Sequence, residues 1–396
     1  MGLLCLESVN EAPSYNDLAI RLNSTVGEAA SRQAFWKRVN NDACVSFMTS
    51  VLGKVIRDQT PMDMPKFHNK RILIQDSTVI KLPLKLFDSF SGVANKHTQV
   101  CNARIQTVYD LLAGKFVSFS IDSYSKNDAK AASELCLQKG DLVLRDRGYS
   151  SSQEIKRHQD NNADLILRYK HKTNYLDFKT LKPLDLLSLL KKNTTLDLQV
   201  RLDNSEKTPI RLVAAPVNEE TANIRRMKAK KEAKGSNLSK NFLELMSWSI
   251  FLTTLPKDRA EFSELLKIYG LRWRIENIFK TWKSNFNFTA IHNVSKYQLK
   301  CILVARLITI VIATNKIYKY FYAIIKEKFN RHLSLMKLIR YLQVNNNTLH
   351  VYQLIKSENV EGLLHALNKY CTYENRTKRK NFCQNQELVF SMLDLS

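Results

Sequence analysis

The sequence predicts an α/β fold in which helical regions flank a core of strands and helices. Three observations lead to this prediction: alternating hydrophobic periodicity begins at Arg71, short apolar runs are bounded by glycine, and helical periodicity returns after residue 258. The 396 residues are enough for two or three domains. With 44% hydrophobic and 25% charged residues, the composition excludes wholesale disorder.

Residues 13 to 60 have helical periodicity. Ser14 is expected to begin one helix, residues 24 to 27 to interrupt it, and Ser31 to begin a second helix whose basic residues lie within 32 to 38. Two short helices around a break, the second one basic, are typical of a helix-turn-helix that binds DNA. Small helical bundles have the same pattern, so DNA binding and a bundle both remain open for this segment.

Residues 69 to 170 contain strands and helices in the order β-β-β-α-β-α-β. A first strand surrounds Asp76, and Gly114 joins two further strands into a hairpin. The elements expected next are a helix from Asn127 to about Leu137, a strand at 142 to 144 that leads to Asp146, a turn at Gly148, a helix at 150 to 158 and a strand at 165 to 167. An antiparallel hairpin followed by crossover helices and parallel strands is the order of an RNase H-like domain, although other α/β folds share parts of it.

The remaining sequence predicts an insertion and more helices. Strand-like runs at 196 to 202, 210 to 217 and 248 to 255 bracket a basic segment, 225 to 231, for which a solvated helix face is the simplest interpretation. The predicted organisation is a helical DNA-binding region (1–68), the first part of a catalytic core (69–170), an inserted, mostly β domain (171–256), the second part of the core (257–345) and a helical C-terminal region (346–396) with a basic cluster at 376–380.

The charge favours a polyanionic partner such as nucleic acid. There are 61 Lys and Arg against 37 Asp and Glu, which gives a net charge of +24. A ribosome-associated or merely basic surface is the alternative. The 7 cysteines occur singly, which argues against a zinc ribbon or a disulfide framework and suits a reducing cytoplasm. The N-terminus does not resemble a signal peptide, and residues 301 to 314 are too short to span a bilayer; we therefore expect a buried helix there and no membrane partner.

Four polar residues form one stripe if residues 268 to 283 are a single helix. Their offsets of 3, 7 and 14 residues return to nearly the same side of the helix; they are Tyr269, Arg272, Glu276 and Lys283. A parallel apolar stripe is expected to face the core; it consists of Ile268, Leu271, Ile275, Ile278 and Trp282. The polar stripe would then line the edge of a cleft, and a chance arrangement on a solvated face is the alternative.

Three carboxylates could converge beside this stripe. Asp76 lies within an apolar strand, Asp146 ends another strand, and Glu276 follows on a helix. Carboxylates in one place repel one another unless cations neutralise them, and such oxygen-rich sites suit Mg²⁺ or Mn²⁺. Two such ions can activate water and stabilise the leaving oxygen at phosphorus. For either Asp alone, a capping or turn role would be the simpler interpretation.

The spacing Y-(2)-R-(3)-E-(6)-K resembles the signature of the DDE transposases of the insertion-sequence-4 family. The match has no gap, and the long interval between Asp146 and Glu276 is where that family inserts a β domain into its RNase H-like fold. Other segments resemble the family's first-Asp strand, its second-Asp motif and its basic strand end; they are Gln75-Asp76-Ser77-Thr78, Asp146-Arg147-Gly148-Tyr149 and Leu167-Arg168-Tyr169-Lys170. The resemblance extends over roughly residues 13 to 345.

The resemblance implies cut-and-paste DNA transposition. Asp76, Asp146 and Glu276 would hold two Mg²⁺ ions, which Mn²⁺ could replace, and cleavage would proceed through a DNA hairpin. The residues that would bind DNA are Tyr269, Arg272 and Lys283, with Arg147, Arg168 and Lys170 as weaker additions, and Trp248, which would stack on a flipped base. For Trp248 a core aromatic is nearly as good an interpretation. The partners implied by the resemblance are transposon ends and target DNA. The resemblance also implies a homodimer when two ends are paired, located in the cytoplasm at the nucleoid.

Two alternative functions remain open at the sequence level. Another RNase H-like nuclease, such as a structure-specific resolvase, would need the carboxylates but neither the full Y-R-E-K stripe nor the long insertion. A non-catalytic DNA-binding protein derived from a transposase would need neither. The intact Asp76, Asp146 and Glu276 argue against this second alternative, because a lost activity would leave those positions free to change.

Overall fold

The chain divides into two compact units. The computed structural model describes residues 4–5, 14–27, 30–60, 71–92, 99–233, 237–344, 351, 354–355, 357, 359–374 and 381–393. The first unit comprises Met1–Met64, Ser77–Lys126 and Trp273–Leu388, and the second comprises Pro65–Asp76, Asn127–Arg272 and Val389–Ser396. Strand β1 (Arg71–Lys81) begins in the second unit and ends in the first.

Parallel strands form the centre of the second unit. β1 pairs with β4 (Asp141–Arg145), which pairs with β5 (Asp164–Arg168). These strands read as continuous apolar runs because helices cover such sheets on both faces, and the paired row Leu73, Val143 and Leu165 is fully buried. The intervening helices are α5 (Asp128–Ala132), the 3-10 turn η2 (Arg147–Tyr149) and α6 (Ser152–Asp160). With β2 and β3 beside β1, this order confirms the predicted α/β core and its order of strands and helices, β-β-β-α-β-α-β.

Helix α5 is shorter than predicted. Asn127 caps it as expected, with its side chain accepting from the Lys130 amide at 2.9 Å, but the helix ends at Ala132 rather than near Leu137. The Ala132 carbonyl accepts instead from Arg157 at 2.9 Å, and the Leu135 carbonyl accepts from Arg157 at 2.8 Å. These guanidinium bonds replace the helical bonds that would have continued the helix, which sequence periodicity cannot reveal.

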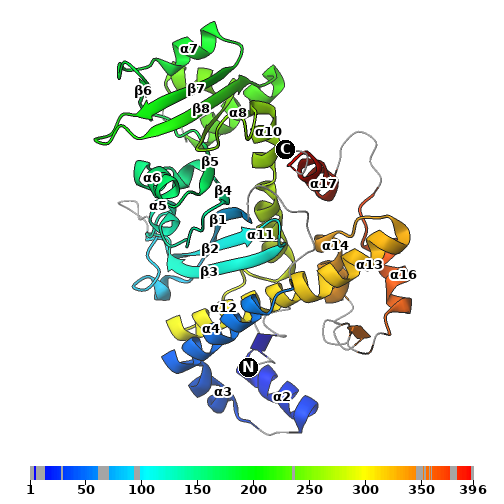
Figure 1. Cartoon of the computed structure of the whole chain (residues 1–396). Helices are drawn as coiled ribbons and strands as arrows, with labels where there is room; N and C mark the ends of the chain where they lie inside the picture. The colour runs from blue at the N-terminus through cyan, green and yellow to red at the C-terminus, as the bar shows by residue number, and fades with distance from the viewer. Residues whose placement is uncertain are drawn as a thin grey trace. The chain divides into compact units, whose positions relative to one another are not determined.

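The insertion continues the second unit with antiparallel strands. Strand order runs β5-β9-β8-β7-β6, and the strands are β6 (Tyr175–Asp177), β7 (Leu196–Leu202), β8 (Pro209–Pro216) and β9 (Trp248–Thr253). Three of these strands were predicted. The helices of this region are α7 (Leu186–Lys192), α8 (Glu219–Glu232), α9 (Lys240–Leu245) and α10 (Phe262–Gly270), of which the sequence did not predict α7 and α9. Helix α7 lies with β6 and β7 at one end of the unit (Figure 1).

The N-terminal helices are packed onto the first unit. The predicted helices are α2 (Tyr15–Val26) and α3 (Arg32–Val39), capped by Ser14 and Ser31. A further helix, α4 (Asp42–Arg57), lies along α12 (Lys296–Ile312), as Figure 1 shows, and Met48 and Leu52 of α4 are buried. Residues 42 to 57 are therefore part of the core of this unit.

The rest of the first unit is a hairpin and a set of helices. β2 (Asn102–Asp110) and β3 (Lys115–Ser123) meet at Gly114, whose positive φ of 58° suits the predicted turn. Trp282 of α11 (Trp273–Asn285) packs on Phe119 of β3, with ring centroids 5.9 Å apart. The remaining elements are the 3-10 turn η1 (Leu84–Leu86), the π-helix η3 (Ala313–Tyr318), α13 (Lys319–Phe329), α14 (Leu335–Val344), α16 (Glu361–Tyr370) and α17 (Phe382–Leu393).

The apolar run around Arg306 is a buried helix, as predicted. The helical stretch Lys296–Phe329 is long and apolar enough to cross a membrane, but 89% of its most apolar window is buried inside the protein. Arg306 itself is fully buried and donates to the Ala290 carbonyl at 2.9 Å. The predicted basic cluster at 376–380 lies outside the described residues.

Candidate active site

Two of the predicted carboxylates lie just beyond the paired part of neighbouring parallel strands in the second unit. The last row of residues paired across these strands consists of Ile74, Leu144 and Ile166. Asp76, Asp146 and Arg168 each follow this row by two residues, and a spacing of two keeps side chains on the same face of a sheet. Asp76 is still within β1, which continues to Lys81, whereas Asp146 follows the end of β4, and the register directs the three side chains to one face.

Asp146 does not serve as a helix cap. It occupies the position before η2, but its side chain makes no capping hydrogen bond, and no donor in the described parts of the chain pairs with it. The carboxylate is half-buried. Nearby, a Cβ on Gly148 would approach Asp128 Oδ2 to 3.0 Å, so a side chain here would press on α5. A larger residue at position 148 would therefore require the Asp128 carboxylate to shift.

Asp76 is compensated by an ion pair. Arg272 Nη1 lies 2.6 Å from Asp76 Oδ2, and the side chains are only 10% and 18% exposed, respectively. An unpaired carboxylate would be costly in this apolar strand, and the guanidinium offsets that cost. Arg272 was predicted to bind a DNA phosphate; the structure places it directly beside a candidate metal ligand.

Tyr269 lies among the same charged groups. Its ring packs on Phe251 of β9, with centroids 4.8 Å apart. Burial raises the pKa of the Tyr269 hydroxyl to about 12; Arg272 and Arg168 oppose this shift, and Asp146 adds to it. The hydroxyl therefore stays protonated at neutral pH and can donate a hydrogen bond.

The Y-R-E-K residues do not lie on one continuous helix, so that prediction was wrong. α10 ends at Gly270 and α11 begins at Trp273, with Arg272 in the turn between them. The Leu271 amide donates to Ile268 and the Arg272 amide to Tyr269, both at 3.0 Å, which is a tight 3-10 turn where Gly270 weakens the helix. The apolar stripe is buried as predicted, at Ile268, Leu271, Ile275, Ile278 and Trp282.

Glu276 and Lys283 belong to the first unit. Both lie on α11, where Glu276 is half-buried and Lys283 is exposed. Within the described ranges, no group of three His, Cys, Asp or Glu side chains is arranged to hold a metal ion. The second unit brings together Asp76, Asp146 and their neighbours, and carboxylate oxygens on adjacent strand ends are donors that a hard divalent cation prefers.

The other predicted DNA-binding residues lie at the edges of this region. Arg147 is exposed in η2, and Lys170 is exposed just beyond β5. Trp248 begins β9 and is half-buried against the core of the insertion, which leaves both a stacking and a packing role open.

One residue beside this region was missed by the sequence analysis. Arg225 belongs to the basic run that was interpreted as a solvated helix face, yet it is half-buried and donates to the Trp248 carbonyl at 3.0 Å. The sequence contains no signal that separates it from its neighbour Arg226, because only tertiary contacts distinguish them.

Two carboxylates on adjacent parallel strands of an α/β fold, with Arg and Tyr beside them, are an arrangement that suits the processing of phosphodiesters. The family model of the transposase DDE domain matches residues 67–312, and the chain belongs to this family. It is a DNA transposase, an enzyme with polynucleotidyl transferase and endonuclease activity, and the family uses a divalent metal ion.

Known proteins similar to this chain include several transposases. The transposase for insertion sequence element IS231B of Bacillus thuringiensis subsp. berliner is 26% identical over 404 residues, covering 95% of this chain and 83% of the relative. The transposase for IS1151 of Clostridium perfringens is 25% identical over 335 residues, covering 76% and 70%. A cryo-EM structure of the piggyBac transposase synaptic complex with hairpin DNA has a TM-score of 0.45 at 11% identity, covering 96% and 76%.

Proposed function

We propose that this enzyme moves an insertion sequence by cut-and-paste transposition. It would cleave DNA at terminal inverted repeats and join the freed 3′ ends to a target. Support comes from the similarity to insertion-sequence transposases along most of the chain. The observation that carries the proposal is the register that sets Asp76 and Asp146 just beyond the paired part of adjacent strands, near Tyr269 and Arg272.

Asp76, Asp146 and Glu276 are the proposed metal ligands. Two Mg²⁺ ions, or Mn²⁺ in their place, would supply an activated water and stabilise the leaving oxygen. The protonated Tyr269 hydroxyl donates to a phosphate oxygen near the scissile bond. Arg272 has five N–H donors, so it can hold Asp76 in position and bind a phosphate with its other donors.

Further roles are proposed for the residues around this centre. Lys283 binds phosphate, and Arg147 and Lys170 add weaker backbone contacts. Trp248 stacks on a base extruded from a hairpin intermediate, and its replacement by Ala should then slow hairpin formation more than nicking. The protein acts in the cytoplasm at the nucleoid, as a homodimer on paired ends.

Base recognition is proposed for the N-terminal helices. The basic side chains of α3 are exposed, and Trp36 is 48% exposed on the same helix. An exposed basic helix is suited to the major groove. Because α4 packs on α12, deletion of residues 1 to 60 would damage the core, and Arg32, Lys37 and Arg38 should be replaced by Ala instead. Loss of preference for end sequences, seen by footprinting, is the expected result.

The central test is cleavage of end-containing DNA by Asp76→Asn, Asp146→Asn and Glu276→Gln. Each should lower metal-dependent nicking by at least about 100-fold, because each removes a ligand charge. Gel-shift affinity without metal should change by less than about twofold, since no phosphate contact is lost. Asp160→Asn makes the same change on an exposed residue at the end of α6 and should leave nicking intact. Full nicking by any of the three variants would remove that residue from the metal site.

A further inference from the structure

Arg225 of the inserted segment is directed to the strand that adjoins the candidate active site. It lies in the middle of α8 and donates to the Trp248 carbonyl at 3.0 Å and to Ser249 Oγ at 3.1 Å. These two acceptors begin β9, the strand that pairs with the end of β5. The side chain therefore lies over the junction between the insertion and the parallel strands.

The strand register places Arg225 and Arg168 on the same face. Arg168 is paired with Phe251, and side chains of directly paired residues share a face of the sheet. Ser249 precedes Phe251 by two residues and shares that face too. Because Arg225 binds Ser249 Oγ, its guanidinium lies on the side where Arg168 projects and where Tyr269 packs on Phe251. Burial lowers the pKa of Arg225, and the charge of Arg168 lowers it further, in agreement with this placement on one face.

The two arginines have no acidic partner. In the described parts of the chain, neither guanidinium is paired with a carboxylate, and the only hydrogen bonds of Arg225 are those to Trp248 and Ser249. Two like charges close together repel one another, and the repulsion is relieved when an anion binds between them. A planar guanidinium is well suited to a phosphate.

We propose that Arg225 and Arg168 form a two-arginine clamp for a backbone phosphate of the DNA strand. Arg225 is thereby the residue through which the insertion holds DNA at the active-site side of the sheet. The inference deepens the proposed function and rests on it.

The neighbouring residue Arg226 provides a matched control. It lies on the same helix and ties α8 to the same stretch of chain, donating to the Leu243 carbonyl at 3.3 Å and to Ser247 Oγ at 2.5 Å. Unlike Arg225, it pairs with a carboxylate, that of Glu219 at 2.7 Å. Its charge is already neutralised, so its loss should not change the number of phosphates bound.

The experiment measures how DNA affinity depends on salt in the cleavage-deficient Asp146→Asn background. The probe is a labelled duplex from the end of the element that carries the gene. Arg225→Ala and Arg168→Ala should each weaken binding about tenfold and lower the slope of log affinity against log salt by about 1. Arg225→Lys keeps the charge and should keep most of the slope, whereas Arg226→Ala should match the parent in slope.

An unchanged salt slope for Arg225→Ala would overturn the clamp. The melting temperature of Arg225→Ala shows whether that variant folds. If it does not fold, the salt slopes of Arg225→Lys and of the exposed Arg168→Ala test the clamp instead. A salt slope of Arg168→Ala equal to that of the parent protein would then overturn the clamp. Wild-type protein that binds the duplex but never nicks it with metal would refute the proposed function instead. The two failures are therefore distinguishable.

Discussion

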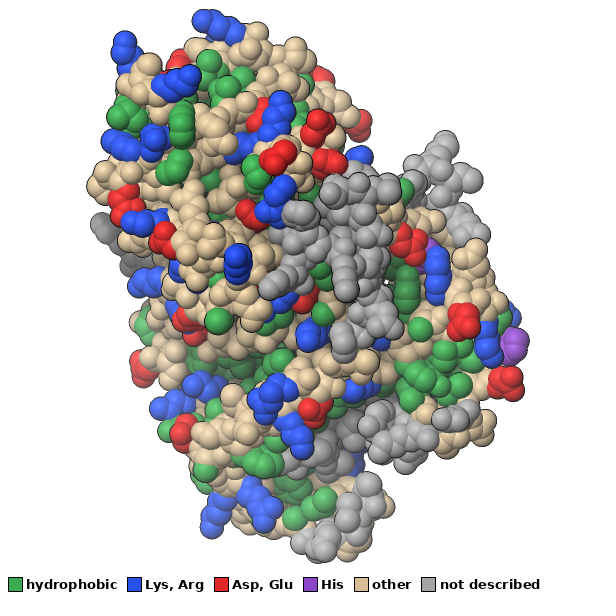
Figure 2. Space-filling model, viewed as in Figure 1, with side chains coloured by type: hydrophobic (Ala, Val, Ile, Leu, Met, Phe, Trp, Pro, Cys, Tyr) green, Lys and Arg blue, Asp and Glu red, His purple; other side chains and the backbone are tan. Residues whose placement is uncertain are grey.

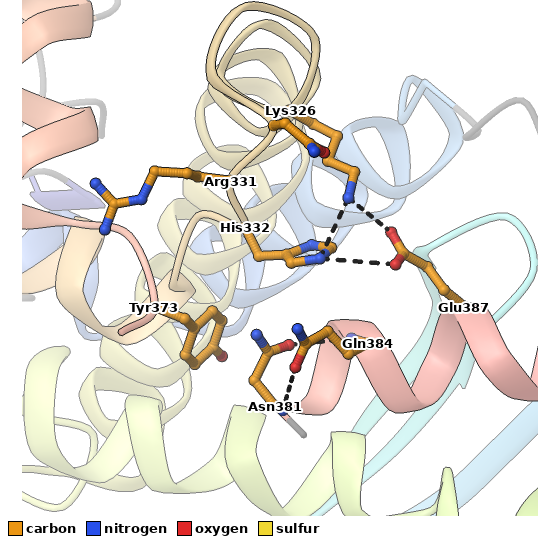
Figure 3. A pocket seen from close by; sticks show the side chains of 8 residues that line it. Lys326, Arg331, His332, Tyr373, Asn381, Gln384 and Glu387 are labelled. Atoms are coloured by element: carbon orange, nitrogen blue, oxygen red, sulfur yellow. Dashed lines mark hydrogen bonds and ion pairs between the residues drawn. The ribbon is translucent and has the colours of Figure 1, made fainter. Parts of the chain in front are cut away.

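Two basic regions of this protein differ in how their charges are neutralised. In the second unit, Arg168 and Arg225 share one face of the sheet without a carboxylate partner among the described residues. In the first unit, a cavity of about 290 Å³ is lined by two cationic side chains, Lys326 and Arg331, and by His332 (Figure 3). Composition alone does not distinguish these regions, since both contribute to the net charge of +24.

The cations of the cavity are occupied by partners from their own unit. Glu387 lies 3.4 Å from Lys326 and 3.6 Å from His332, and Figure 3 shows it facing both. Arg331 extends away from Glu387 and donates to the Asn368 carbonyl at 3.1 Å. Figure 2 shows Lys and Arg side chains spread over the visible face rather than gathered in one patch. We therefore expect a cation without a carboxylate partner among the described residues, such as Arg225, to be more available to DNA than one that pairs with a carboxylate, such as Lys326.

The largest effect on DNA affinity is expected when positive charge is removed from each of the two regions in turn. Arg225→Gln and Lys326→Gln each remove one positive charge. The first should weaken DNA binding about tenfold and the second less than about threefold, because in the described parts of the chain only Lys326 pairs with a carboxylate, that of Glu387. Fluorescence anisotropy at one fixed ionic strength provides the comparison. Equal losses of affinity would mean that DNA binding depends only on the overall charge of the protein.

A buried histidine of α6, His158, should make the stability of the protein depend on pH. His158 is fully buried, and burial lowers its pKa to about 4, with Arg145 contributing. The folded protein keeps this ring neutral while the unfolded chain binds a proton below about pH 6.5. Stability is thus complete above pH 6.5 and falls as the pH drops toward 4, by about 1.4 kcal/mol per pH unit from this group. Chemical denaturation along a pH series measures it, and His158→Gln should remove that part of the slope; an identical slope in the variant would exclude His158.

The smallest effect on DNA affinity is expected when the Glu387 carboxylate of the cavity is removed. Glu387→Gln leaves Lys326 and His332 in place but removes the carboxylate that pairs with them. If pairing is what keeps the cavity from binding DNA, the variant should bind a random-sequence duplex about threefold more tightly at low salt. Parental affinity in the same titration would show that the cavity is excluded from DNA for another reason.

Part of the site could be predicted from the sequence. Asp76 was expected within an apolar strand and Asp146 at the end of another, and the structure has both in those places. The register of the parallel strands then fixes the row of side chains that follows their paired part. The turn at Gly270 was missed because the apolar stripe stays in phase across it, so periodicity gave no indication of a break. Arg225 and Arg226 look alike in the sequence and differ only in their tertiary neighbours.

The packing of α4 could not be predicted for a similar reason. Its apolar residues indicate an amphipathic helix, but not which helix covers them. The partner, α12, lies more than 200 residues away in the sequence, and local periodicity carries no information about such a contact.

Metal-directed cleavage of the protein itself tests the central claim most directly. When hydrogen peroxide is added, Fe²⁺ bound in place of Mg²⁺ is oxidised to Fe³⁺ and gives hydroxide and a hydroxyl radical, which cuts the nearest backbone with no need for DNA or transposase activity. The account predicts fragments that end near Asp76 and Asp146, lost in Asp146→Asn. Fragments that end instead near Lys326 or Glu387, with none at the two strand ends, would contradict it.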